Sequence, residues 1–317
     1  MSLLLREAEV ESLLPIPEAI EAVEQGFGLL GRGEATNYSR QRATAPQAVL
    51  NVMWAMAPTL KMMGVKVYPI VRTDVTQGSS FTYLLYGLPE GKLESVLEAD
   101  TLGQRRTGAA SAVATRYLAR PESETLTVFG AGWQAESQVE AVAHVLPNLR
   151  RVYVVGRSPE RRNAFIEKMR ERLNLSVGAA EPEEAARAAD VLITITGSSE
   201  PVFDGTWLKA GTHVNAAGVN FPDKRELDAE VLRCASRVIA DSAEAASVDS
   251  GDLLRNDFAW DRLEELGSIV AGTAPGRRTK EEITVFESHG LAIEDLVCAV
   301  RVLHRAREAG SGFKLPI

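Results

Sequence analysis

Residues 125–135 read TLTVFGAGWQA, and this stretch decides the fold of the chain. An apolar, β-branched run ends at Gly130, and Gly132 and Ala135 complete the spacing G-x-G-x-x-A before a helical pattern begins. The first glycine permits a tight turn, the second lets the backbone approach a pyrophosphate, and the small third residue allows close helix–strand packing. The helix N-terminus then offers free N–H groups and a positive dipole end to phosphates. This order predicts a dinucleotide-binding unit, against the alternative of a glycine-rich packing turn.

Strands and helices alternate on the C-terminal side of this turn. The compact apolar runs are RVYVVGRS, VLITITGS, THVNAAGV, RVIADS and ITVFES, and helical patterns cover residues 134–146 and 159–173. Continuous apolar strands separated by helices are typical of a parallel sheet that is covered on both faces. We therefore predict a Rossmann-type NAD(P)-binding domain over residues 119–290.

The first 118 residues have a different pattern. Apolar residues recur at helical spacing at Ala19, Ile20, Val23, Phe27 and Leu30. Short alternating runs then cover residues 49–98, and the last two flank PEG at 89–91, which is a hairpin signal. A helix is expected over about 101–118, and another over 291–309. The chain is thus predicted to be α/β, with a smaller, mostly antiparallel α+β domain formed by residues 1–118 and 291–317.

Composition excludes several classes of protein. The 317 residues are 45% hydrophobic and 25% charged, with a net charge of −8, so a nucleic-acid or anionic-membrane surface is not expected. The N-terminal residues fit neither a signal peptide nor a membrane span. Cys234 and Cys298 lie far apart without metal-ligand spacing. We expect a cytoplasmic protein without a metal site.

The strand after the glycine-rich turn indicates which dinucleotide is bound. NAD sites usually carry an acid there for the ribose hydroxyls, but this chain has Gly156, Arg157 and Ser158, with Arg161 one turn away. A guanidinium binds a 2′-phosphate through two hydrogen bonds, whereas a carboxylate repels it. The pattern favours NADP(H), with NAD(H) possible; the alternative is a solvated helix start.

Three cationic residues lie in apolar or structured surroundings in the first domain. Arg40 lies in NYSRQRAT with Arg42 beside it, Lys66 lies inside the strand GVKVYPIV, and Arg106 precedes a helix face of small residues. The small residues suggest the close approach of another element or a ligand. Two arginines and a lysine that converge would hold a carboxylate and leave an ammonium able to donate a proton. Each one alone could equally be a surface charge.

Together these segments resemble the ornithine cyclodeaminase/mu-crystallin family. The resemblance rests on ESLLPIPEAIEAVEQGF, GVKVY, EADTLGQRRTGAASAVATRYLARP, TVFGAGWQAESQ, HVNAAGVNFPDKREL and TVFESHGLAIEDL. It implies a homodimer in which the first domain, completed by the C-terminal helix, is the dimerisation and substrate domain, and in which a Rossmann domain binds NAD(H) or NADP(H). It also implies that Arg40, Lys66 and Arg106 match the family's substrate-binding arginines and active-site lysine.

One position departs from the family pattern. Where cyclodeaminases carry an aspartate after N-A-x-G, this chain has Asn220, and Asn51 also replaces an expected acid. An amide forms hydrogen bonds but does not take a proton near neutral pH. Ornithine cyclodeamination is therefore disfavoured.

The remaining chemistry is hydride transfer. We predict an NADP(H)-dependent oxidoreductase that acts on the C=N or CH–NH bond of a small anionic imino or amino acid, with Lys66, Arg40, Arg106 and Asn220 in its active site. The alternatives are an NADPH-gated, non-catalytic small-ligand binder and, less favoured, ornithine cyclodeaminase. The residues expected to line the cofactor site are Gly130, Ala131, Gly132, Trp133, Gln134, Gly156, Arg157, Ser158, Arg161, Thr196, Gly197, Ser198, Ala217 and Gly218.

Overall fold

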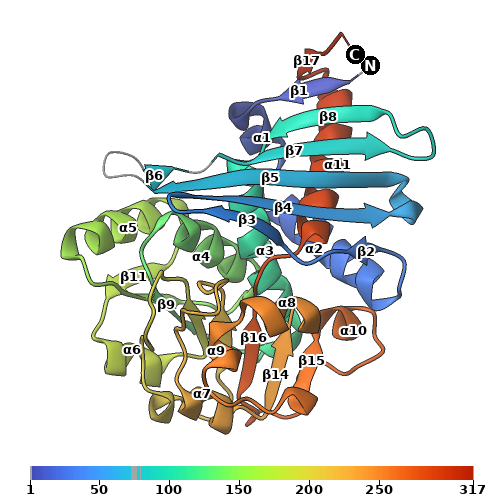
Figure 1. Ribbon diagram of the computed structural model, residues 1–317. Coiled ribbons are helices and arrows are strands. Elements are labelled where there is room, and N and C mark those ends of the chain that lie inside the picture. The colour runs from blue at the N-terminus through green and yellow to red at the C-terminus, as the bar shows by residue number, and fades with distance from the viewer. Residues whose placement is uncertain (1, 73–76, 79, 317) are drawn as a thin grey trace. The chain divides into compact units, whose positions relative to one another are not determined.

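Contacts between residues divide the chain into two compact units. Unit 1 comprises Met1–Arg106 and Gly290–Ile317, and unit 2 comprises Thr107–His289. The computed structural model describes residues 2–72, 77–78 and 80–316 (Figure 1). We predicted domain boundaries after residue 118 and before residue 291, and these boundaries remain a prediction.

Unit 1 is built on a mostly antiparallel sheet. Its described strands are β1 (Leu3–Leu5), β2 (Thr36–Asn37), β3 (Gln41–Ala45), β4 (Ala48–Ala57), β5 (Met62–Arg72), β6 (Gln77–Gly78), β7 (Thr82–Gly87), β8 (Leu93–Glu98) and β17 (Phe313–Lys314). The order is β17-β1-β8-β7-β5-β4-β2, with β3 paired to β4 and β6 to β5. Strands β7 and β8 pair antiparallel across the predicted hairpin, which is confirmed.

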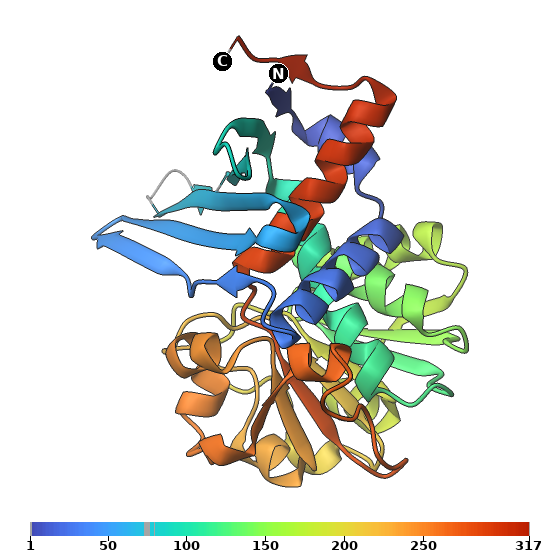
Figure 2. The ribbon, with the colours of Figure 1, turned by 90° about the vertical axis from the view of Figure 1, so that its right-hand side faces the viewer.

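Helices cover one face of this sheet. The helical segments of unit 1 are α1 (Glu7–Leu13), α2 (Ile16–Gly31), η1 (Pro58–Leu60) and α11 (Ala292–Ala309). Figures 1 and 2 show α11 lying across the sheet. Side chains alternate between the two faces of a strand, so Met53, Lys66 and Tyr83, which are paired across β4, β5 and β7, are all buried on one face.

Unit 2 is a doubly wound parallel sheet. Its strands are β9 (Thr125–Phe129), β10 (Arg151–Val155), β11 (Ser176–Ala179), β12 (Val191–Thr194), β13 (His213–Ala216), β14 (Arg237–Ala240), β15 (Leu263–Glu265) and β16 (Thr284–Glu287). They pair in the parallel order β11-β10-β9-β12-β13-β16-β14-β15. The helical segments are α4 (Trp133–Val145), α5 (Pro159–Arg172), α6 (Pro182–Ala188), η2 (Gly205–Trp207), α7 (Ala229–Cys234), α8 (Ala243–Asp249), α9 (Gly251–Leu254), η3 (Trp260–Arg262) and α10 (Leu266–Val270). Helix α3 (Asp100–Leu118) begins in unit 1 and ends in unit 2.

Two apolar cores cover the two faces of the parallel sheet. Leu126 and Val128 of β9 point into one core, together with α4 and α5 residues such as Val139 and Phe165. Phe129 points into the other, which includes residues of α7. A strand that is buried on both faces reads as a continuous apolar run, which explains the sequence pattern. The predicted fold class is confirmed.

The small residues after Arg106 bring two helices into close contact. A Cβ atom added at Gly108 of α3 would lie 2.3 Å from the carbonyl oxygen of Ser137 in α4. Ala109 and Ala112 are fully buried beside it. The close approach predicted from this stretch is therefore made by another helix. Within the described residues, no helix has the length and apolarity needed to span a bilayer.

Candidate functional site

A buried charge network occupies unit 1 beneath α11. Lys66 on β5 is 1% exposed, and its Nζ donates to Oδ2 of Asp295 at 2.6 Å. Arg106 Nη1 donates to Oε2 of Glu294 at 2.7 Å, and Arg106 Nε lies 3.2 Å from Oδ1 of Asp295. The structure thus brings together two of the three predicted cations, and it places a carboxylate from the first turn of α11 against each.

The third cation, Arg40, adds positive charge to this network. It lies between β2 and β3, is 9% exposed, and its charge lowers the pKa of Lys66. We call Arg40, Lys66, Arg106, Glu294 and Asp295 the charge network. Two arginines therefore act on the same buried lysine, and guanidinium groups are suited to bind a small carboxylate.

Burial decides the protonation state of Lys66. Loss of water lowers its pKa from 10.5 to about 8, and Arg106 acts in the same direction, while Asp295 opposes both. An ammonium with a pKa near 8 is charged at neutral pH and gives up its proton far more readily than an exposed lysine. A buried thiol, Cys298, lies one turn after Asp295 on α11, and its pKa is raised mainly by burial.

Asn51 leaves a hydrogen-bond acceptor inside unit 1. It lies on β4 opposite Tyr68 of β5 and is 1% exposed. Its Nδ2 donates to the Tyr68 carbonyl at 3.4 Å, while its Oδ1 is buried and, among the described residues, has no hydrogen-bond partner. A buried acceptor without a partner costs free energy, so a ligand N–H is a suitable occupant.

The glycine-rich turn of unit 2 has the geometry that a pyrophosphate requires. Gly130 has a φ of +124°, which favours glycine, and a Cβ atom there would lie 2.4 Å from the Ile195 carbonyl oxygen. Gly132 is the N-cap of α4, and within the described chain no side chain caps that terminus. The positive end of the α4 dipole therefore lies at the glycine-rich turn without a capping side chain, which favours an anion there. Ala131, Trp133 and Gln134 follow the same turn, and Trp133 is 47% exposed.

The next strand ends without a carboxylate at the expected position. Gly156 and the exposed Arg157 follow β10, and Ser158 caps α5 by accepting from the N–H of Arg161 at 3.3 Å. The Ser158 hydroxyl donates to the Glu160 carboxylate at 2.8 Å. The loop therefore presents one guanidinium at its tip, together with a capped helix start.

Two more strand ends stand beside the glycine-rich turn in the sheet. Thr196, Gly197 and Ser198 follow β12, and Ala217 and Gly218 follow β13. Strand order reverses between β9 and β12, which is where open α/β sheets bind ligands at the carboxyl ends of their strands. Asn220 lies in the same loop as Gly218, within unit 2.

A cluster of buried acids lies behind these loops. Glu226 is fully buried, and its backbone N–H donates to Oδ1 of Asp252 at 2.7 Å. Glu287 accepts from the Ser250 hydroxyl at 3.0 Å. Burial raises the pKa of Glu226 to about 8 and that of Asp252 to about 6. His289, which the sequence did not assign to catalysis, lies 3.2 Å from Asp241 through Nδ1.

Three functional candidates were missed in the sequence. Glu294 and Asp295 stand within the TVFESHGLAIEDL motif, where two adjacent acids open an otherwise apolar helix. Their signal was their position between Ile293 and Leu296, both fully buried. Glu226 stands in the NFPDKREL stretch, where it reads as one charge among several. Its burial could not be read from the local pattern.

Known proteins are similar to this chain over nearly its whole length. The model of the ornithine cyclodeaminase/mu-crystallin family matches residues 1–310. The Delta(1)-pyrroline-2-carboxylate reductase of Bacillus cereus is 35% identical over 273 residues, which is 83% of each chain. The Delta(1)-pyrroline-2-carboxylate reductase of Thermococcus litoralis, solved with NADH and L-proline, is 33% identical with a TM-score of 0.94, over 99% of this chain and 100% of that one. An archaeal alanine dehydrogenase dimer with bound NAD is 30% identical with a TM-score of 0.94, over 100% and 99%. All three are reductases or dehydrogenases, so the predicted enzyme class is confirmed.

Proposed function

Because the chain belongs to the ornithine cyclodeaminase/mu-crystallin family, we propose that it is an NADP(H)-dependent reductase of a small imino acid. The same site would catalyse the reverse dehydrogenation of an amino acid. The observation that carries the proposal is the charge network of unit 1, in which two arginines act on a buried lysine of pKa about 8 that donates to Asp295. Binding of an anion and delivery of a proton are the two tasks that imine reduction asks of this unit.

The charge network divides these tasks among its members. Arg40 and Arg106 bind the substrate carboxylate, because a guanidinium matches a carboxylate in shape and charge. Lys66 donates a proton to the imine nitrogen, and Asp295 holds its ammonium in place. A nicotinamide, when bound by the loops of unit 2, would supply the hydride for the imine carbon. The C=N bond thereby becomes CH–NH, with one hydride and one proton added.

The cofactor residues of unit 2 favour NADP(H). Arg157 stands where NAD-binding chains carry an acid, and it is exposed and able to meet a 2′-phosphate. Glu160 is directed to the Ser158 hydroxyl, which keeps one carboxylate hydrogen-bonded within the loop. Relatives with bound NADH and NAD leave NAD(H) as the second candidate.

The amide side chains argue against cyclodeamination. Asn220 and Asn51 stand where the family's cyclodeaminases use acids, and neither accepts a proton near neutral pH. Asn51 offers a buried Oδ1 that fits an imine or amine N–H. Asn220 orients the substrate or the nicotinamide amide by hydrogen bonds.

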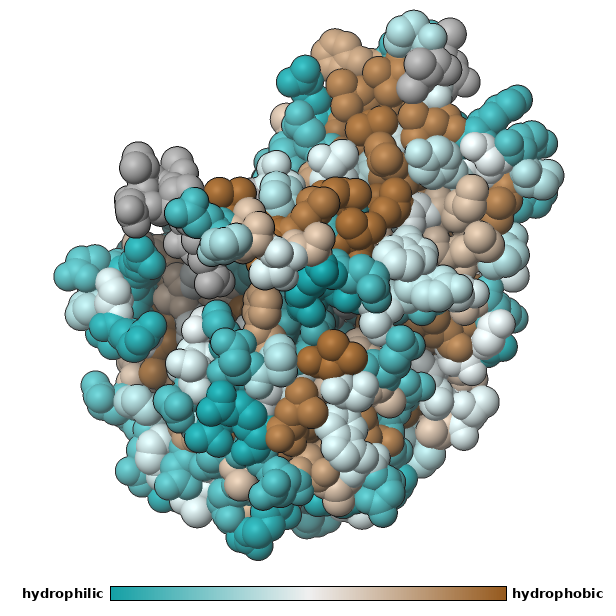
Figure 3. Space-filling view, in the orientation of Figure 1, coloured by the Kyte–Doolittle hydropathy of each residue, from teal (hydrophilic) through white to brown (hydrophobic). Residues whose placement is uncertain are grey.

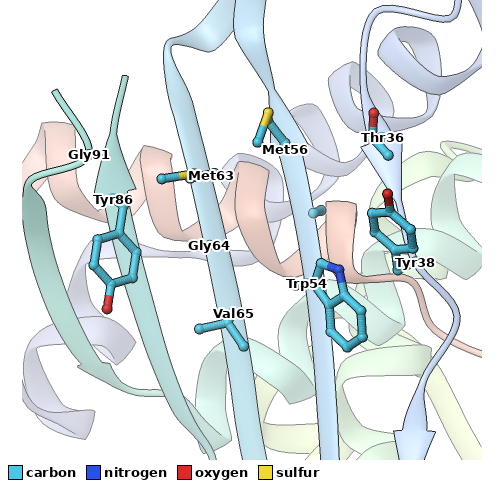
Figure 4. A pocket seen from close by; sticks show the side chains of 10 residues that line it. Thr36, Tyr38, Trp54, Met56, Met63, Gly64, Val65, Tyr86 and Gly91 are labelled. Atoms are coloured by element: carbon cyan, nitrogen blue, oxygen red, sulfur yellow. The ribbon is translucent and has the colours of Figure 1, made fainter. Parts of the chain in front are cut away.

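We also propose that the protein is a homodimer paired through the uncovered face of the unit 1 sheet. Figure 3 shows hydrophobic residues gathered over the strands of this sheet. A hollow with a volume of about 520 Å³ lies on this face, between β2, β4, β5 and β7. Figure 4 shows Trp54, Met63, Val65 and Tyr86 around it. An apolar patch of this kind marks an interaction surface. Light scattering should give a dimer that Val65→Asp converts to monomer.

A substrate screen that follows NADPH absorbance tests the reaction. Delta(1)-pyrroline-2-carboxylate, larger cyclic ketimines, and 2-oxo acids mixed with amines are the substrates to compare. Consumption of NADPH with any of them supports the proposal. Tight NADPH binding without consumption would instead identify a ligand-binding protein, and release of ammonia from ornithine would identify a cyclodeaminase.

A further inference from the structure

One buried carboxylate joins the two loops that follow β12 and β13. Glu226 Oε1 accepts the backbone N–H of Thr196 at 2.5 Å, and Oε2 accepts the backbone N–H of Gly218 at 3.0 Å. The side chain is fully buried, and its two oxygens each serve a different loop. The spacing between the loops therefore depends on this one residue.

The hydrogen bond between Gly218 and Glu226 requires a glycine at position 218. A Cβ atom added there would lie 2.3 Å from Oε2 of Glu226 and 2.6 Å from the backbone nitrogen of Thr196. Both distances are shorter than any ordinary non-bonded contact, so the loop reaches the carboxylate only because residue 218 has no side chain. The absence of a side chain at 218 and the carboxylate at 226 belong to the same arrangement.

The backbone of Glu226 is itself fixed by hydrogen bonds, both at its N–H and at its carbonyl group. Its own N–H and that of Leu227 donate to Oδ1 of Asp252 at 2.7 Å each, and its carbonyl accepts from the N–H of Val202 at 2.9 Å. Asp252 lies in the first turn of α9, whose start is capped by the Ser250 hydroxyl. A carboxylate with a fixed backbone can act as a fixed spacer between the loops.

We propose that Glu226 is a positioning residue that sets the part of the cofactor site that receives the nicotinamide. The inference rests on the proposed function. The loops it joins lie at the carboxyl ends of β12 and β13, on one side of the point where strand order reverses. The glycine-rich turn and the Arg157 loop, which would hold the pyrophosphate and the adenosine ribose, lie at the ends of β9 and β10. None of the hydrogen bonds of Glu226 goes to those two loops in the part of the chain that the structure describes.

This separation gives a test with two ligands. NADPH contains the nicotinamide, whereas 2′-phospho-ADP-ribose lacks it and keeps the remaining contacts. In Glu226→Gln one oxygen becomes an NH₂ group that faces a backbone N–H, so one loop loses its acceptor. We expect the Kd for NADPH to rise about tenfold, as for the loss of one buried hydrogen bond. The Kd for 2′-phospho-ADP-ribose should change by less than about twofold, measured by calorimetry.

Amide hydrogen exchange supplies an independent readout in the protein without ligand. Glu226→Gln should speed exchange in segments 195–198 and 217–220 and leave segment 130–135 unchanged. Glu230→Gln is the matched control, since Glu230 lies four residues on and its carboxylate pairs with Arg233 on the surface of α7. That control should alter neither ligand affinity nor exchange. Gly218→Ala perturbs the same contact from the other side and should reproduce the split between the two ligands if Glu226→Gln folds poorly.

Equal weakening of both ligands in Glu226→Gln would show a general loss of structure and overturn the inference. Unchanged affinity for NADPH would overturn it as well. If the wild-type protein bound neither ligand, the proposed function would be contradicted, and the role of Glu226 in the nicotinamide site would be contradicted with it. That result is obtained without any variant, so it is distinguished from a failure of the inference alone.

Discussion

In unit 1 the buried charges alternate in sign, whereas in unit 2 buried carboxylates gather with one another. Lys66 and Arg106 each touch an acid of α11 within 3.2 Å. Glu226, Asp252 and Glu287 instead rely on backbone N–H groups and a hydroxyl. The first arrangement places each acid against a cation, whereas in the second burial raises the pKa of all three acids, and neighbouring carboxylates add to this for Glu226 and Glu287.

The two arrangements predict different effects on stability when one buried charge is removed. A paired ion leaves its partner uncompensated when it is removed, at a large cost. A crowded acid opposes its neighbours when ionised, so removing its charge relieves repulsion. The same chemical change should therefore have opposite signs in the two units.

The largest effect is expected at Lys66. Lys66→Met removes the proposed proton donor and should lower kcat by about 10²- to 10⁴-fold. The affinity for NADPH should stay within about twofold, because the cofactor residues belong to unit 2. Steady-state kinetics and fluorescence titration measure the two quantities. Lys92→Met, an exposed residue of unit 1, is the control. Retained turnover in Lys66→Met would remove this residue from the mechanism.

Asp295→Asn should be the most destabilising of the acid-to-amide changes. It leaves Lys66 and Arg106 without their shared anion, and we expect the free energy of unfolding in urea to fall by about 3–5 kcal/mol. Glu183→Gln breaks an exposed pair with Arg187 and should cost less than about 0.5 kcal/mol. Similar losses for the two variants would mean that burial does not govern these pairs.

Asp252→Asn should act in the opposite direction. The amide keeps the oxygen that accepts from Glu226 and Leu227. The folded-state pKa of Asp252 is raised from 3.8 to about 6, so its ionisation lowers stability as pH rises through that range and the cost is complete above it. We expect a gain of about 1–3 kcal/mol at pH 8 and a smaller gain at pH 5. Asp261→Asn, an exposed acid of the same unit, should show no such pH dependence. A loss of stability at pH 8 would show that the cluster is not repulsive.

The pH dependence of turnover should report the pKa of Lys66. The ammonium is present below about pH 8 and lost above it, so kcat/KM for imine reduction should fall about tenfold per pH unit on the alkaline side. In Lys66→Arg the cation persists, and any remaining activity should lose this alkaline limb. An unchanged limb in that variant would assign it to another group.

The smallest effect is expected from the solvent-exposed Arg157. Arg157→Ala should raise the Kd for NADPH by about five- to tenfold and leave that for NADH within about twofold, because the lost contact is with the 2′-phosphate. Arg151→Ala, an exposed arginine on the same strand β10, is the control. Equal weakening of both cofactors would contradict the role in phosphate recognition.

The repeating parts of the fold could be predicted from the sequence. Strands such as β9 and β13 are buried on both faces, so their apolar runs are unambiguous, and helix α3 ends at Leu118 as its pattern predicts. Strands β11 and β15 were not predicted, because they are the two edge strands of the sheet and are only partly buried. They therefore lack the continuous apolar run by which the central strands were recognised.

The site was predictable residue by residue but not as an arrangement. Lys66 was conspicuous because a charge interrupts an apolar strand. Its partner Asp295 lies 229 positions away, and no local pattern joins two such residues. Glu226 was indistinguishable from its charged neighbours in PDKREL, because burial of one side chain in a loop depends on the loops that fold over it.

Cys298 gives unit 1 a chemical reporter of its own opening. Its thiol is fully buried on α11, and its raised pKa leaves almost no thiolate, which is the form that alkylating agents attack. Iodoacetamide should therefore label it only while α11 is lifted from the sheet. The labelling rate in native buffer, compared with that of an unfolded chain, gives the free energy of that transient opening. Substrate analogues that bind the charge network should slow labelling in proportion to their occupancy.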